Sequence, residues 1–299
     1  MKGNCLLTIL IIFGNCTSKK GSEATLDPIV YATEIDGWHK KRVEELKGPK
    51  GWLNVTGLFW LNEGITTFGS GSQNNIVFPE GKIPEFAGFF MLKQNTVLLE
   101  TSDAGITCQG KPVKTQIIYH PDSAKALVLD YGSLQWLIIK RDTKYGVRLR
   151  DFKNPAIEGF KGIERYPVDG AWRAEAKFEK ADSSRTIMIT NVLGQTTPQL
   201  SPGTLVFALK GKEYRLDVLD EGGDEYFMIF GDVTNAKETY GAGRYLYVKH
   251  PDENGNTLVD FNKAYNPPCA FTEFATCPLP PKQNVLDIAV TAGEKDYSR

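Results

Sequence analysis

The sequence predicts a mainly β protein with one short amphipathic helix near its N-terminus, and three observations indicate this fold class. Val, Ile, Thr, Tyr and Phe are frequent, and 29 Gly and 16 Pro interrupt the apolar runs. Helical periodicity is almost absent after residue 48. The apolar segments are short, and turn residues separate them at intervals of roughly eight to twelve residues. This spacing is typical of β-sandwiches and partly closed barrels.

Residues 1–16 are predicted to be a targeting segment. The apolar run Cys5 to Phe13 is shorter than the about 20 residues that a membrane-spanning helix needs, but it suits the core of a secretory signal. The following "GNC" resembles the end of a bacterial lipobox, in which Cys16 would be lipidated. The alternative is an ordinary signal peptide with an unmodified Cys16. With residues 17–30 as a polar tether, we expect a membrane-anchored protein of the bacterial cell envelope, or a secreted one if Cys16 is not acylated.

Residues 31–155 are predicted to form an N-terminal domain of one helix and a β-sandwich. Tyr31, Ile35, Trp38, Val43 and Leu46 have near-helical spacing, and "GP" at 48–49 ends the helix. Two strands joined by a tight turn are expected in "LFWLNEGITTF". In "LQWLIIKRDTKYGVRLRDF", mixed apolar and basic positions predict longer strands of a sheet with one wet face.

Part of this domain resembles the forkhead-associated (FHA) sandwich. The resemblance lies in "TFGSGSQNNIVFP", "AGFFMLKQNTVLLE" and "ITCQGKPV". The FHA family reads phosphothreonine through an Arg after the first Gly and a Ser-x-x-His motif. Ser70 stands at the Arg position, and "IPEFAGFF" replaces the second motif. The resemblance therefore implies an FHA-like fold without phosphopeptide recognition.

Residues 156–299 are predicted to form a second β domain, a sandwich or partly closed barrel. The Gly- and Pro-rich stretch "KNPAIEGFKGIERYPVDG" marks the boundary. The domain carries a polar block of Asp, Asn, Tyr and Cys residues near its end. We expect sheet folding to gather the candidate ligand-binding residues into one concave patch, and these residues are Arg173, Arg244, Asp260, Asn262, Tyr265 and Asn266.

Arg244 follows the turn "TYGAG" and begins an apolar run. As a two-pronged donor it would meet Asp260 or an anionic ligand. The alternative is a buried ion pair that fixes the strand register.

Asp232 and Asp260 each end an apolar run, and two such acids facing one cleft would suit a hydrolase as general acid and base. Asp at strand ends also serves turns, which is the alternative. The sequence contains no Gly-x-Ser-x-Gly elbow. Whether the protein is an enzyme therefore stays open at this point.

Cys269 and Cys277 allow three interpretations: a disulfide, two separate buried thiols, or a metal or redox site. An oxidising compartment favours the disulfide. Their spacing is not that of a zinc finger. We predict no metal and no cofactor.

Four motifs in order resemble the Domain of Unknown Function 1684 family: "GWLNVTGLFWLNEG", "YPVDGAWR", "TYGAGRYLYV" and the polar block that contains "VDFNKAYNPPCAF". The resemblance implies a bacterial protein, often secreted or lipid-anchored, and no established activity. The net charge of −1 excludes the basic surface of a nucleic-acid-binding protein. We therefore expect an envelope lipoprotein whose C-terminal β domain binds a small polar ligand or a partner, with a hydrolase that uses paired carboxylates or a metal as the alternative.

Overall fold

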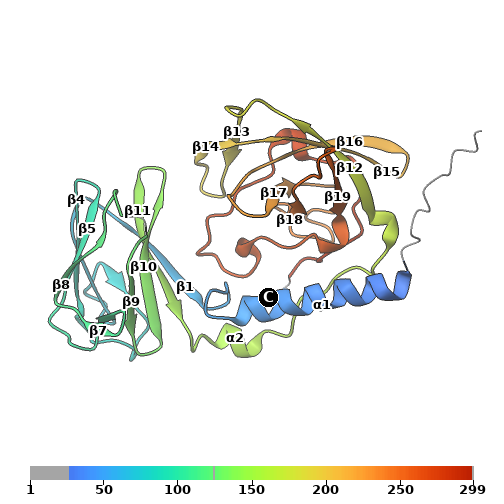
Figure 1. Ribbon diagram of the computed structural model, residues 1–299. Coiled ribbons are helices and arrows are strands. Elements are labelled where there is room, and N and C mark those ends of the chain that lie inside the picture. Colours follow the sequence, from blue (N-terminus) through green and yellow to red (C-terminus); the bar gives the residue numbers. More distant parts are fainter. Residues whose placement is uncertain (1–26, 124, 298–299) are drawn as a thin grey trace, which may run out of the picture.

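The computed structural model describes residues 27–123 and 125–297, in which two β-rich domains lie side by side (Figure 1). The predicted signal segment and Cys16 lie outside the described residues. Within the described ranges, no helix is both long and apolar enough to span a membrane. The mainly β fold class and the N-terminal helix are confirmed, and the strands of the N-terminal domain form a sandwich as predicted.

The helix α1 (Pro28–Lys47) runs along the C-terminal domain (Figure 1). It begins at Asp27, whose side chain accepts hydrogen bonds from the first backbone N–H groups, and ends at Gly48. The Tyr31 hydroxyl donates to Asp260 Oδ1 over 2.7 Å, and Arg42 Nε lies 3.2 Å from Glu294 Oε1. This placement corrects the predicted grouping of residues 31–155, because the polar partners of the helix lie in the C-terminal domain.

The N-terminal domain is a sandwich of two sheets. One sheet has the order β1 (Val55–Leu61), β11 (Lys144–Asp151), β10 (Leu134–Arg141), β9 (Val128–Tyr131), β6 (Thr107–Cys108) and β7 (Lys111–Pro112). The other has the order β3 (Ile76–Val77), β2 (Gly64–Gly69), β4 (Gly88–Lys93), β5 (Thr96–Glu100) and β8 (Thr115–Tyr119). Both sheets contribute to one apolar core, which contains the fully buried rings of Phe68, Phe78, Phe90 and Trp136.

The C-terminal domain contains three antiparallel groups of strands, none of which closes into a barrel. The largest has the order β16 (Lys212–Val218), β15 (Gly203–Leu209), β12 (Arg173–Lys180) and β19 (Asn256–Asp260). The other two are the pairs β17 (Glu225–Phe230) with β18 (Arg244–Lys249), and β13 (Thr186–Thr190) with β14 (Thr196–Leu200). The four-stranded sheet and the β17–β18 pair share one core, to which Phe207, Phe230 and Phe261 contribute.

Short helices complete the chain: α2 (Pro155–Gly159), η1 (Gly170–Trp172), η2 (Phe261–Lys263), η3 (Pro268–Ala270) and η4 (Lys282–Asn284).

The loop that contains η3 joins the two domains. Thr272 Oγ1 donates to the backbone oxygen of Val55 over 3.1 Å, and Arg141 Nε donates to Thr276 Oγ1 over 2.9 Å. Val55 and Arg141 belong to β1 and β10. One face of the six-stranded sheet is therefore covered by the C-terminal domain at these strands, and is not the wet face that the charge pattern predicts.

Candidate functional site

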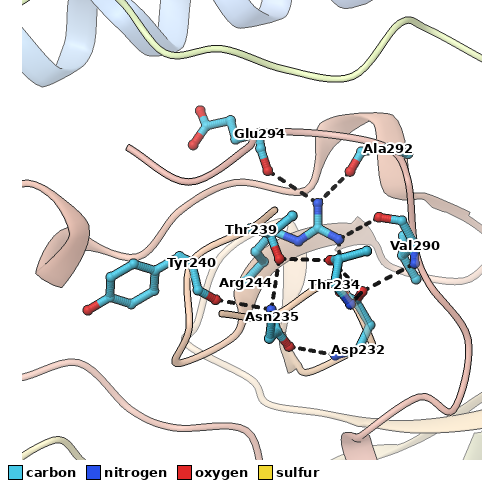
Figure 2. A network of polar contacts seen from close by, with 9 residues as sticks. All are labelled: Asp232, Thr234, Asn235, Thr239, Tyr240, Arg244, Val290, Ala292 and Glu294. Atoms are coloured by element: carbon cyan, nitrogen blue, oxygen red, sulfur yellow. Dashed lines mark hydrogen bonds and ion pairs between the residues drawn. The ribbon is translucent and has the colours of Figure 1, made fainter. Parts of the chain in front are cut away.

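Arg244 lies in a closed polar network inside the C-terminal domain (Figure 2). Its side chain is fully buried, and Nη2 donates to Asp232 Oδ2 over 2.9 Å and to the Val290 oxygen over 2.8 Å. Nη1 donates to the backbone oxygens of Ala292 and Glu294. Asp232 therefore takes the place of the expected partner Asp260. The contacts agree with the alternative of a buried structural ion pair, since all acceptors come from the protein itself.

Asp232 has no free carboxylate oxygen for acid-base chemistry. Its Oδ1 accepts hydrogen bonds from the backbone and hydroxyl of Thr234 over 2.8 and 2.6 Å, and from Val290 N over 3.2 Å. Asn235 continues the network, since its side-chain amide donates to the Tyr240 oxygen over 3.0 Å (Figure 2). The group thus ties the loop after β17 to the C-terminal segment.

Asp260 and Asn262 form a second buried group, which holds the start of α1. Asp260 Oδ1 accepts from Tyr31 Oη over 2.7 Å and from Asn262 N over 3.1 Å. The Asn262 amide donates to Tyr31 Oη and to the Asp169 oxygen, both over 2.9 Å. Burial and the hydrogen bond to Asp260 raise the pKa of Tyr31 well above its ordinary value. The Arg173 guanidinium lies 5.4 Å from the centre of the Tyr31 ring.

Asn266 belongs to a third group, around the middle of α1. Its backbone N–H donates to Glu294 Oε2 over 2.7 Å, and its amide donates to the Lys295 oxygen over 2.7 Å. Arg42 Nη2 donates to the Asn266 oxygen over 2.9 Å. Burial raises the pKa of Glu294, although Arg42 and the Asn266 N–H act in the opposite direction.

The expected single concave patch is therefore wrong for most of its members. Asp260 caps η2, and Asp232 accepts from the backbone two residues on, so both acids serve the local turn chemistry that was the alternative. The two acids share no partner among the contacts of the described residues. Arg173 lines a separate surface hollow over β12, β15 and β19. Among the predicted ligand-binding residues, Tyr265 alone lines a cavity between the two domains.

This interdomain cavity has a volume of about 370 Å³ and lies where α1, β10, β18 and the η3 loop meet. Residues from both domains line it, namely Arg42, Trp52, Arg141, Glu221, Phe227, Tyr245, Tyr247, Tyr265, Pro268, Ala275, Thr276, Cys277 and Pro278. Its size suits a small ligand, because ligand pockets have volumes of about 300–1,000 Å³.

Aromatic rings form one wall of the cavity. Tyr247 and Tyr265 are stacked with ring centres 6.0 Å apart, and Tyr245 meets Tyr265 edge-on at 5.8 Å. Arg42 lies over the Tyr265 ring at 4.5 Å from its centre. Burial raises the pKa of both Tyr245 and Tyr265, so these phenols are neutral at physiological pH. They provide an apolar surface with polar tips.

Arginine side chains lie at the N-terminal-domain side of the cavity. Arg141 lines it, and the Arg148 guanidinium lies 5.1 Å from the centre of the Trp52 ring, which also lines it. Arg148 is 8% exposed, and its Nε and Nη2 are buried without a hydrogen-bond partner. This cluster was not predicted, because the basic positions of β10 and β11 were expected to face solvent. The signal was the two-residue spacing of Arg148 and Arg150, which places both on one face of the strand.

Cys269 and Cys277 are joined by a disulfide, with their Cα atoms 6.1 Å apart. The bridge closes the loop that carries Thr272 and Thr276 against the N-terminal domain, and Cys277 lines the cavity. Within the described part of the chain, no group of three or more His, Cys, Asp or Glu residues is arranged to hold a metal ion. Of the three interpretations, the structure contains the disulfide.

Comparison with known proteins finds a family match within the C-terminal domain. Residues 158–295 match the model of the family described as "Protein of unknown function (DUF1684)", which confirms the predicted family resemblance. The match does not include the N-terminal motif "GWLNVTGLFWLNEG". No curated protein matches the chain at a significant level.

Solved structures show partial similarity. The solution structure of an uncharacterized protein from gene locus rrnAC0354 of Haloarcula marismortui is 29% identical over 47% of this chain and 80% of that one, with a TM-score of 0.40. An FHA domain studied for phosphothreonine-dependent interactions is 16% identical over 31% of this chain and 92% of that one, with a TM-score of 0.22. The FHA domain of FhaA, complexed with the intracellular domain of Rv3910, is also 16% identical over 31% of this chain, with a TM-score of 0.22. The match covers 97% of that domain.

Proposed function

We propose that this chain, whose C-terminal domain matches a family of unknown function, binds a small molecule in the cavity between its two domains. The observation that carries the proposal is the convergence there of five aromatic and three charged side chains from separate segments. The rings supply apolar contact area, and the guanidinium groups of Arg42 and Arg141 supply directed donors. This combination is typical of small-molecule sites.

Binding is better supported than hydrolysis. A hydrolase of the kind considered from the sequence needs two carboxyl groups that face the same substrate. Both Asp232 and Asp260 are occupied by hydrogen bonds within the fold. Among the described residues that line the cavity, Glu221 provides the one carboxylate, and it accepts a hydrogen bond from Tyr247 Oη over 3.1 Å.

We further propose that the protein works in the bacterial cell envelope, held by a lipid on Cys16. The disulfide between Cys269 and Cys277 supports an oxidising compartment, because such bridges are rare in reducing cytosol. Expression of the full chain and of a Cys16→Ser variant, followed by detergent phase partition, tests the anchor. We expect the unaltered chain in the detergent phase and the variant in the aqueous phase. An aqueous position for both would contradict lipidation.

Thermal-shift screening tests the binding proposal. Panels of sugars, nucleotides, amino acids and small aromatic acids are added to the purified full chain. A ligand at about 100 times its Kd adds about 2.7 kcal/mol of stability, which raises Tm by about 5 °C or more in a protein of this size. We expect at least one class to produce such a shift.

A pair of Tyr→Leu variants then locates the site. Tyr247 lines the cavity, whereas Tyr226 is a partly buried ring on the neighbouring strand that stacks against Phe178 outside the cavity lining. Tyr247→Leu should weaken binding of the screened compound about tenfold through loss of ring contact, and Tyr226→Leu should leave it unchanged. Absence of any shift, or equal effects of both variants, would refute the site.

A further inference from the structure

A group of three arginines lies on one face of β10 and β11, beside the interdomain cavity. Arg148 and Arg150 are two residues apart on β11, so their side chains leave the strand on the same face. Leu137 of β10 lies directly opposite Arg148, and Arg141 is four residues further along β10. Alternation along β10 therefore brings Arg141 to the same face as the other two.

None of the three arginines forms an ion pair with the acidic residues that the structure describes. Arg150 donates to the Gly51 oxygen and to Asn54 Oδ1, and Arg141 donates to Thr276 Oγ1 and to the oxygen of Lys140. These acceptors are neutral. The Nε and Nη2 atoms of Arg148 have none.

A buried guanidinium without an acceptor is costly, because its N–H groups have lost water and gained nothing in return. Burial and the nearby charges of Arg141 and Arg150 lower the pKa of Arg148 to about 10, because both disfavour the charged form of its guanidinium. A protein that keeps three like charges together in a covered interface gains most from an anion supplied from outside.

Arg148 does not itself line the cavity, but its neighbours do. Arg148 stacks on Trp52, and both Trp52 and Arg141 line the cavity. The other cavity arginine, Arg42, is already paired with Glu294. The excess positive charge therefore lies on the side of Arg141 and Arg148, opposite the tyrosine wall.

Building on the proposed function, we infer that the ligand of the interdomain cavity carries an oxyanion group, a carboxylate or a phosphate. Arg141 contacts this group, the nearby charge of Arg148 attracts it, and the aromatic wall contacts the apolar or planar body of the ligand. Arginine suits this task because its planar fork matches both groups. The same chemistry serves a carboxylic acid and a phosphate ester.

Isothermal titration of the full chain with four probes tests the inference. Benzoate and phenyl phosphate are a planar ring with an oxyanion, benzamide is the neutral counterpart of benzoate, and inorganic phosphate has no ring. At fixed ionic strength we expect at least one ring oxyanion to bind about tenfold or more tightly than benzamide, the factor that a charge-assisted hydrogen bond supplies. The order of benzoate and phenyl phosphate identifies which oxyanion the site prefers.

Three variants assign the effect to Arg148. Arg148→Met should weaken oxyanion binding about tenfold or more and leave benzamide within about twofold, and Arg148→Lys should retain part of the preference because it keeps the charge. Arg215→Met is the matched control, since Arg215 is exposed and paired with Glu179 in the C-terminal domain. It should change no affinity.

Two outcomes would overturn the inference in different ways. If benzoate, phenyl phosphate and benzamide bind equally, or if Arg148→Met keeps the full preference, the oxyanion assignment fails while binding in the cavity stands. If none of the four probes binds, the oxyanion assignment fails as well. The proposed function fails with it only when the wider thermal-shift panel also gives no shift.

Discussion

Replacing Arg244 by Met should destabilise the C-terminal domain by several kcal/mol. The substitution removes a fully buried guanidinium and leaves the Asp232 carboxylate charged and without its cation. Removing one partner of a buried ion pair costs about 3–5 kcal/mol. The oxygens of Val290, Ala292 and Glu294 also lose donors, at about 1 kcal/mol each. Because these contributions overlap, we expect a loss of about 4–6 kcal/mol, against a typical total of about 5–15 kcal/mol.

Urea unfolding followed by circular dichroism measures this loss, and native-state hydrogen exchange locates it. We expect faster exchange in β17, β18 and the segment after residue 285, with the N-terminal sandwich unchanged. Arg215→Met is again the matched control, because its pair with Glu179 is exposed to solvent and should contribute little to stability. Adding Asp232→Asn to Arg244→Met should restore part of the loss, since it removes the orphaned charge. A loss below about 1 kcal/mol for Arg244→Met would refute the structural role.

Three further predictions concern stability. Arg148→Met should raise the free energy of unfolding of the ligand-free protein by about 1–3 kcal/mol, because it removes an unpaired buried charge whose pKa burial lowers to about 10. Urea unfolding checks the sign, and a loss of stability would mean that the guanidinium has a partner in the fold. Replacing both Cys269 and Cys277 by Ser should lower the free energy of unfolding by about 2.5 kcal/mol, because the closed loop no longer restricts the unfolded chain. Dithiothreitol should destabilise the unaltered protein and leave the variant unchanged, and equal effects on both proteins would exclude the bridge. Burial raises the pKa of Asp217, but hydrogen bonds from Arg185 and other donors bring it below its ordinary value. The unaltered protein should therefore be more stable than the Asp217→Asn variant by a constant amount from about pH 5 to 8, and this difference should shrink as the pH falls below about 4. A difference that grows in acid would contradict the lowered pKa.

The sequence predicts local structure well where the signal is local. The helix stop at Gly48 and the spacing of Tyr31, Ile35 and Leu46 predict α1, and these three side chains are its buried residues. The domain that the helix joins is not predicted, because it depends on distant polar partners such as Asp260. No periodicity in residues 31–47 encodes that contact.

The turn after Leu61 shows the same limit. The chain leaves one strand and enters the next there as predicted, but β1 and β2 belong to different sheets and do not pair with each other. Instead, β1 pairs with β11 in antiparallel register from Val55 to Leu61. A tight turn determines the local direction of the chain, whereas strand pairing is decided by which faces share a core.

The candidate site was partly predictable for a related reason. The polar block near the C-terminus was correctly singled out as unusual, but unusual polarity indicates burial with partners as well as ligand binding. Arg244, Asp260 and Asn266 are buried with partners inside the protein, and of the predicted ligand-binding residues only Tyr265 lines the cavity. Arg141 and Arg148 were missed because their surroundings depend on a second domain that covers the sheet.

The pairing of α1 with the C-terminal domain makes the sandwich an inserted module. The chain leaves the larger unit after the helix and returns at almost the same place, where Asn154 Nδ2 donates to the Leu53 oxygen over 2.7 Å and Val55 pairs with Arg150. Such neighbouring ends allow a module to be gained, exchanged or removed without unravelling its host. The host would keep its own architecture after such a loss, but the pocket it shares with the module would lose its basic rim.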